Sequence, residues 1–340
     1  MNKKRIAEHL RVKFNDWLES ITDNNVREMV KTHSIITGGC IVSLLTNESV
    51  NDYDIYFTDM ETAYAVAKYY VDIFNKENKN KKDKKNRFGY RHDAMVLRGG
   101  DEQYIQSQIE GQGEWKWKST MLDIPEGRIK IVIRSDGVAG EKEKSPPSLD
   151  PDRMMTDMDD IDYDKEMEPN DKAKKDEKKE EKYQPKFLTS NAITLTDKIQ
   201  CTIRFYGDPE KIHENYDFIH CTNYWTSYYD QLVLNTNALE SIMDKRLVYR
   251  GSLYPLSSVI RIRKFLARGW KINAGQVLKM CFQLSELNLS DPHVLEDQLM
   301  GVDTMYFLDL IEMVKEKRAK DPDYVIDQQY VCSLVDKIFG

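Results

Sequence analysis

Apolar residues recur along the N-terminal part of the chain at two spacings, one typical of helices and one of strands. From Ile6 to Leu18 every fourth position is apolar, which predicts an amphipathic helix. Residues 34–37 and 53–57 are short apolar runs, and the second alternates like a strand with one buried face. Helices are expected after each of them, at residues 40–45 and 60–74. This strand–helix–strand–helix order predicts an α/β sheet covered by helices.

Further strands and a helical C-terminal part follow. After Asn235 the apolar spacing is helical, and Gly269 stands where a C-terminal helix cap is expected. We therefore predict an all-helical domain behind the sheet. The predicted strands are residues 94–97, 129–133, 192–195 and 199–205, with a tight turn at 196–198, and the predicted later helices are residues 238–243, 256–266, 274–287, 294–300, 305–317 and 331–339.

Two polar tracts interrupt this pattern. Residues 76–87 are rich in Lys and Asn and are expected to form a disordered loop. The tract that ends near residue 186 holds an acidic cluster and a mixed Lys/Glu run, so it cannot bury enough apolar surface to offset its ordering entropy. The predicted domains are an N-terminal helical segment (1–30), an α/β domain (31–135 plus 187–235), a disordered insertion (136–186) and a helical domain (236–340).

The overall composition limits the classes of function. The 340 residues carry a formal net charge of −7, which argues against a surface that coats nucleic acid in general. The five cysteines are widely spaced and include no Cys-x-x-Cys pair, which disfavours a disulfide framework and a zinc knuckle. The chain has no signal peptide pattern and no apolar run of about 18 residues. We therefore expect a cytoplasmic protein without a membrane segment.

The strongest chemical signal is Gly38-Gly39 followed by Asp52-Tyr53-Asp54. Glycines lack a Cβ, so the backbone can approach a phosphate, and the helix predicted after them adds N–H donors and a favourable dipole. Residues two apart in a strand point to one face, so Asp52 and Asp54 would present both carboxylates together to a hard divalent cation. The alternative is a solvated polar lead into the strand, with no metal.

The glycine pair and Asp52-x-Asp54 at this spacing resemble the signature of the DNA polymerase β-like nucleotidyltransferase superfamily. Residues 190–220 and 261–270 are similar to its branch of uncharacterised proteins from large phage and viral genomes. The resemblance implies an α/β (α+β) nucleotidyltransferase fold, in which a mixed sheet flanked by helices precedes a C-terminal all-helical domain. It also implies an NTP substrate, Mg²⁺ or Mn²⁺ as cofactor and, for a phage-encoded member, the host cytoplasm.

The resemblance further implies a third metal-binding carboxylate on a neighbouring strand. Asp217 is the first choice because it precedes residues 218–221, which are predicted to form a short strand. Asp93 and Asp197 are rivals, although Asp197 lies in the predicted turn, where Asp is common for local reasons. His220 is expected to be structural, since a lone histidine on a strand is more often a satisfied core residue than a catalyst.

Other residues are candidates for holding the nucleotide. Ser43 lies one helical turn beyond the glycine pair and could contact a phosphate or simply face water. Arg261, Lys264 and Arg268 share a helix face and could hold a triphosphate or a nucleic-acid backbone. A salt-bridged surface helix explains the same pattern equally well. Residues 115–118 alternate Trp with Lys, which favours a half-exposed edge strand over a base-stacking surface.

The sequence therefore favours a Mg²⁺-dependent nucleotidyltransferase that moves a nucleoside monophosphate from an NTP to a hydroxyl and releases pyrophosphate. The acceptor stays open among an RNA end, a protein and a small molecule. One alternative is a catalytically idle copy of the fold that serves as a binding or virion-associated structural protein. Another is a toxin-like enzyme that modifies host RNA by the same chemistry.

Overall fold

The computed structural model describes residues 2–80, 93–99, 104–111, 114–121, 126–134 and 182–289, with isolated positions at 124, 291, 294, 298, 320 and 321. Among the described residues, those up to Met243 belong to one compact unit and those from Asp244 onward belong to a second. The glycine pair and the predicted carboxylates lie in the first unit. The predicted arginine and lysine helix lies in the second.

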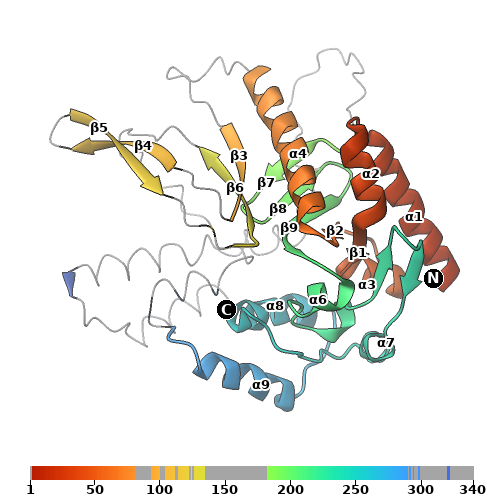
Figure 1. Cartoon of the computed structure of the whole chain (residues 1–340). Coiled ribbons are helices and arrows are strands. Elements are labelled where there is room, and N and C mark those ends of the chain that lie inside the picture. The colour runs from red at the N-terminus through yellow and green to blue at the C-terminus, as the bar shows by residue number, and fades with distance from the viewer. Residues whose placement is uncertain are drawn as a thin grey trace, which may run out of the picture. The chain divides into compact units, whose positions relative to one another are not determined.

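The first unit is built on a seven-stranded mixed sheet in the order β11-β10-β1-β2-β9-β8-β7 (Figure 1). Neighbouring strands are antiparallel except for β2 and β9, which run parallel. The strand that carries Asp54 is therefore at the centre of the sheet. The strands are β1 (Ser34–Thr37), β2 (Tyr53–Phe57), β7 (Pro185–Leu188), β8 (Ala192–Leu195), β9 (Ile199–Tyr206), β10 (Tyr224–Thr226) and β11 (Gln231–Val233).

Two smaller antiparallel pairs belong to the same unit. β3 (Asp93–Arg98) pairs with β6 (Ile129–Arg134), and β4 (Tyr104–Gly111) pairs with β5 (Glu114–Met121). The Trp/Lys alternation at residues 115–118 thus lies on a strand, β5, as the pattern favoured.

Helices α1 (Lys3–Ser20), α2 (Asn24–His33) and α4 (Met60–Asn80) pack on one side of this sheet (Figure 1). The Trp17 indole N–H donates to the Tyr70 hydroxyl at 2.8 Å, which joins α1 to α4 inside the core. Ile55 and Phe57 of β2 are fully buried in the same core. Because alternate strand residues point to opposite faces, Asp54 of β2 lies on the other side of the sheet.

Most of the predicted elements are present. The expected strands 34–37, 53–57 and 192–195 coincide with β1, β2 and β8, and the other three fall within β3, β6 and β9. The helix expected at 40–45 is α3 (Gly39–Thr46), which ends at Asn47 in a left-handed conformation. The turn at 196–198 is also confirmed, with Asp197 at φ 58° and Lys198 at φ 64°.

Two boundaries were predicted wrongly, and several strands were missed. Helix α4 continues past residue 74 to Asn80, so the first part of the Lys- and Asn-rich tract is helical. Strand β7 begins at Pro185, and Tyr183 before it is only 2% exposed, so the polar insertion cannot extend to residue 186. Strands β4, β7, β10 and β11 were not predicted, and β10 and β11 are three residues long, which is too short for a periodic signal. The remainder of both tracts lies outside the described residues.

The second unit contains α8 (Pro255–Ala267) and α9 (Ala274–Ser285). Gly269, at φ +78°, follows α8, and the N–H groups of Gly269 and Trp270 donate to the carbonyls of Leu266 and Phe265. The predicted C-terminal cap at Gly269 is therefore confirmed. Helix α7 (Thr236–Met243), which was predicted to open the helical domain, belongs to the first unit instead.

The helices predicted beyond residue 290 lie outside the described residues, apart from the isolated positions. Among the helices that the structure describes, none is both long and apolar enough to cross a membrane.

Candidate functional site

The glycine pair connects β1 to α3. Gly38 has φ +89°, a left-handed conformation that glycine adopts freely and other residues rarely do. A Cβ at this position would lie 2.9 Å from Oδ2 of Asp54, so any other residue would force the Asp54 carboxylate to move. Gly39 opens α3, and no side chain caps the N-terminus of that helix. The first N–H groups of α3 are thus left without a side-chain cap, as in helix starts that bind anions.

One of the two predicted carboxylates, Asp54, lies beside this turn. Antiparallel pairing of β1 with β2 sets Thr37 opposite Asp54, which is half-buried. Burial first, and then the charge of the exposed Asp52, raise the pKa of Asp54 to about 7. The pair therefore carries a repulsion that a bound cation would relieve. The structure places Asp54 next to the glycine turn and within electrostatic reach of Asp52, and their role as metal ligands stays a prediction.

A tyrosine that the sequence analysis missed lies beside the same turn. The hydroxyl oxygen of Tyr216 is 3.5 Å from the position that a Cβ at Gly38 would take. Two side-chain oxygens, this hydroxyl and Asp54 Oδ2, are therefore close to the same position beside the glycine turn. The Tyr216 ring packs against Tyr56 and His213, with centroid distances of 6.1 and 5.0 Å. Burial, followed by the neighbouring Tyr56 and Asp54, holds the pKa of Tyr216 well above its ordinary value. The hydroxyl therefore stays protonated and can donate a hydrogen bond.

The segment that carries Tyr216 is fixed to the end of β1. Nε2 of His213, the last residue of α6 (Pro209–His213), is 2.9 Å from the Thr37 hydroxyl. That hydroxyl is also 2.8 Å from the Asn223 carbonyl, and the Gly38 N–H donates to the Cys221 carbonyl at 3.3 Å. No spacing in the sequence connects these residues to the glycine pair, because they meet only through the order of strands in the sheet.

Asp217 does not lie on a strand. Residues 218–221, predicted to be extended, instead form the 3₁₀ turn η1 (Ile219–Cys221) after an extended Phe218. The short apolar run favoured a strand, but the chain must turn here to reach β10. The charge of Asp217 acts on His220, whose pKa is lowered to about 4, first by burial. His220 is therefore a neutral, buried imidazole, in keeping with the structural role expected of it.

The neighbouring strand supplies no third carboxylate either. β9 pairs with β2 in a register that sets Gln200 opposite Asp54, and its sequence, IQCTIRFY, contains neither Asp nor Glu. Within the described ranges, no three His, Cys, Asp or Glu side chains form a group that could hold a metal ion. The structure thus assembles two of the three predicted carboxylates, and it does not bring Asp217 into a metal-binding group with them.

The two rivals of Asp217 lie at other places in the fold. Asp93 begins β3, where its backbone is in register with Arg134 of β6. Asp197 lies in the β8–β9 turn, and its Oδ2 accepts a bond from the Tyr183 N–H at 3.4 Å. Ser43 is half-buried, one turn into α3, and its role stays a prediction.

The predicted cationic residues lie in the second unit. Arg261 and Lys264 belong to α8. Arg268 was predicted to share their helix face, but it is the residue that follows the last residue of the helix. Arg261 and Lys264 are half-buried and Arg268 is exposed. Contact of this group with a nucleotide stays a prediction.

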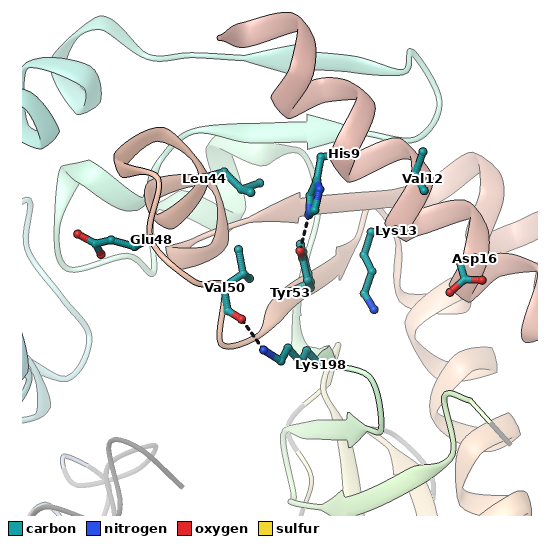
Figure 2. A pocket seen from close by; sticks show the side chains of 9 residues that line it. All are labelled: His9, Val12, Lys13, Asp16, Leu44, Glu48, Val50, Tyr53 and Lys198. Carbon is teal, nitrogen blue, oxygen red and sulfur yellow. Dashed lines mark hydrogen bonds between the residues drawn. The ribbon is translucent and has the colours of Figure 1, made fainter. Parts of the chain in front are cut away.

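A hollow of about 710 Å³ lies on the opposite face of β2 (Figure 2). Tyr53, the residue between the two aspartates, lines it, and the Tyr53 hydroxyl is 2.7 Å from Nε2 of His9 on α1. None of the residues predicted to form the site lines this hollow. Its lining consists of His9, Val12, Lys13, Asp16, Leu44, Glu48, Val50, Tyr53 and Lys198.

Comparison with known proteins adds a biological setting. Residues 8–245 match the family described as Gabija anti-defense 2 family protein, and this range includes the glycine turn and all of the predicted carboxylates. A stretch of 148 residues is 20% identical to the "Gabija anti-defense 2" protein of Bacillus phage SPbetaL7, and it covers 40% of this chain. The chain spans 36% of the length of that relative. No solved structure matches the chain.

A phage relative agrees with the resemblance to phage proteins expected from the sequence. An anti-defence role was not among the functions that the sequence analysis considered. No residue pattern in the sequence identifies a defence system, so the anti-defence role could be suggested only by similarity to a known protein.

Proposed function

We propose that the chain, which belongs to the Gabija anti-defense 2 family, is a metal-dependent nucleotidyltransferase. By this activity, carried by the site described above, it would counter the Gabija defence. The family name supports the biological setting. The resemblance of the glycine pair and the Asp-x-Asp strand to the nucleotidyltransferase signature supports the chemistry.

The observation that carries the chemical part is the contact between the glycine turn and the carboxylate strand. The place where a Cβ of residue 38 would stand is 2.9 Å from Asp54 Oδ2, and it lies at the uncapped start of α3. N–H donors for a phosphate and a carboxylate for a cation are therefore adjacent. A metal–triphosphate complex requires this combination, whereas a solvated polar turn gives no reason for it.

The donor set fits Mg²⁺ or Mn²⁺. Asp52 and Asp54 offer oxygen ligands only, and Mg²⁺ is commonly held by one or two carboxylates while water and phosphate oxygens complete its shell. The raised pKa of Asp54 is also consistent with a carboxylate pair that lacks its counter-charge. When bound, the metal would neutralise charge on the triphosphate and stabilise the oxygens of an in-line displacement.

The chain's own residues would bind and orient the nucleotide. The N–H groups at the start of α3 would donate to phosphate oxygens, and the absence of a Cβ at Gly38 lets the phosphate approach. The Tyr216 hydroxyl, which stays protonated, would donate to an oxygen bound in the same place. In the transfer, the acceptor hydroxyl would lose its proton to water and its oxygen would form a bond to the α-phosphorus. The bond from that phosphorus to the bridging oxygen of the β-phosphate would break, and pyrophosphate would leave.

The proposal is tested in cells that carry the Gabija defence. The protein, its Asp54→Asn variant and an Asp72→Asn control are expressed, and phage plaques are counted. Asp72 is an exposed carboxylate on α4, so its loss matches the charge change away from the site. The unmodified protein and the control should restore plaques, and Asp54→Asn should not.

A second experiment tests the reaction itself. Purified protein is incubated with each labelled NTP, Mg²⁺ or Mn²⁺, and RNA plus protein extract from the defended cells. Label should move to a macromolecule or small molecule with the unmodified protein and the Asp72→Asn control. It should stay on the nucleotide with Asp54→Asn or with a chelator. Restored plaques without transfer to any acceptor would contradict the enzymatic part of the proposal.

One observation favours a second candidate, a catalytically idle fold that counters the defence by binding. Gln200 stands opposite Asp54, where a carboxylate on the adjacent strand would complete the metal group. A site with two carboxylates can still bind a nucleotide–metal complex, and a bound nucleotide would be sequestered rather than transferred. In that case the protein would bind NTP in calorimetry, no label would move, and Asp54→Asn would still lose both binding and plaque restoration.

A further inference from the structure

Lys198 holds the segment that carries Asp52 at two points. Its Nζ donates to the Val50 carbonyl at 3.0 Å (Figure 2). Its own carbonyl accepts a bond from the Tyr53 N–H at 2.8 Å. Asp52 lies between Val50 and Tyr53, outside the regular pairing of β2, and it is exposed. One residue thus holds the backbone on both sides of Asp52, which lies just outside β2.

The backbone of Lys198 is itself unfavourable for a lysine. Its φ of 64° lies in the left-handed region, which glycine adopts freely and which is costly for an L side chain. Strained residues persist where the surrounding structure or the function requires the side chain. Within the described residues, the Lys198 side chain makes one hydrogen bond, to the Val50 carbonyl, so that bond is the candidate reason for keeping a lysine in the turn.

The turn that carries Lys198 is anchored from α1. Nζ of Lys13 donates to the Asp197 carbonyl at 2.6 Å and lies 5.5 Å from the centre of the Tyr53 ring. The Tyr53 hydroxyl is in turn 2.7 Å from Nε2 of His9. These contacts line the hollow behind β2 and make the turn a rigid support (Figure 2).

We propose that Lys198 is a positioning residue, which sets the Asp52 carboxylate beside Asp54 by holding the Val50 carbonyl. The inference rests on the proposed function and names a residue for it outside the glycine turn and the Asp-x-Asp strand. The side chain lies behind the strand and acts through the backbone, not on the nucleotide. Loss of supporting contacts of this kind typically lowers metal affinity or activity by about 10- to 100-fold.

The test is Lys198→Gly, which removes the side chain and at the same time relieves the backbone strain. A residue that served the fold alone would lower the unfolding temperature when lost. We expect instead that the unfolding temperature of Lys198→Gly is equal or higher. The Mg²⁺ concentration that gives half-maximal transfer from NTP should rise by about tenfold or more. Lys198→Arg retains a donor of similar reach and should recover most of that affinity.

Lys245→Gly is the matched control. Lys245 also has a positive φ, at 46°, but it lies in the second unit. It should gain stability from the same relief of strain without a change in Mg²⁺ dependence.

The outcomes separate this inference from the proposed function. An active Lys198→Gly protein with unchanged Mg²⁺ dependence would overturn the positioning role and leave the proposed function standing. A Lys198→Gly protein that unfolds at a lower temperature, with Lys198→Arg equally unstable, would also overturn it, since the side chain would then serve the fold. Absence of both NTP binding and transfer in the unmodified protein would overturn the two together.

Discussion

Replacing Asp54 by Asn should stabilise the metal-free protein at alkaline pH. Burial and Asp52 raise the pKa of Asp54 from 3.8 to about 7, so the folded state holds this proton more tightly than the unfolded state. Ionised Asp54 therefore destabilises the fold above pH 7. This penalty shrinks as the pH falls through 7 and disappears below the unfolded value near 3.8. At about 1.4 kcal/mol per pKa unit, the full penalty is about 4 kcal/mol.

Asparagine has nearly the same shape and no charge, so it removes the penalty. In urea titrations without divalent metal, Asp54→Asn should be more stable than the unmodified protein at pH 8 by about 2–4 kcal/mol. This difference in the free energy of unfolding between the variant and the unmodified protein should be smaller at pH 5 than at pH 8, by about 2–3 kcal/mol. At pH 8, saturating Mg²⁺ should also reduce the difference, because the Asp54 carboxylate binds the cation and the amide that replaces it does not. A gap that is the same at pH 8 and pH 5 would refute the raised pKa and the carboxylate repulsion behind it.

Two further predictions address the glycine turn and the third carboxylate. In urea titrations, Gly38→Ala should lower the free energy of unfolding by about 1–2 kcal/mol or more, because φ +89° is costly for Ala and its Cβ would meet Asp54 Oδ2. Gly39→Ala is the control: its Cβ would enter open space, so the substitution should be neutral or stabilising in the same assay. Asp217→Ala should retain both Mg²⁺-dependent NTP binding in calorimetry and label transfer, since Asp217 forms no metal group with Asp52 and Asp54; loss of transfer alone would show that Asp217 joins the site when nucleotide is bound.

The sequence was informative where a local pattern decides the local structure. β1, β2 and β8 follow from short apolar runs, and the helix end after Leu266 follows from Gly269, because each depends on residues close together in the chain. The meeting of the glycine turn with Asp54 could also be anticipated, since a strand, a helix and a second strand in succession leave few arrangements. Tyr216 and Lys198 could not be found in this way, because strand order and register alone bring them to the site.

The register of β2 with β9 decides how much chemistry the site can perform. The resemblance implies a third carboxylate on a neighbouring strand, and the sequence predicts Asp217 in that role, with residues 218–221 as the strand. The neighbour of β2 is instead β9, and its residue at the level of Asp54 is Gln200. A glutamine can orient a ligand but cannot carry the negative charge that attracts a second metal ion. If the site binds metal as proposed, it is therefore better suited to one metal ion held with the triphosphate than to two shared among three carboxylates. If transfer occurs, the acceptor hydroxyl must then be activated by another route, because Asp54 is itself a proposed ligand of that one metal ion.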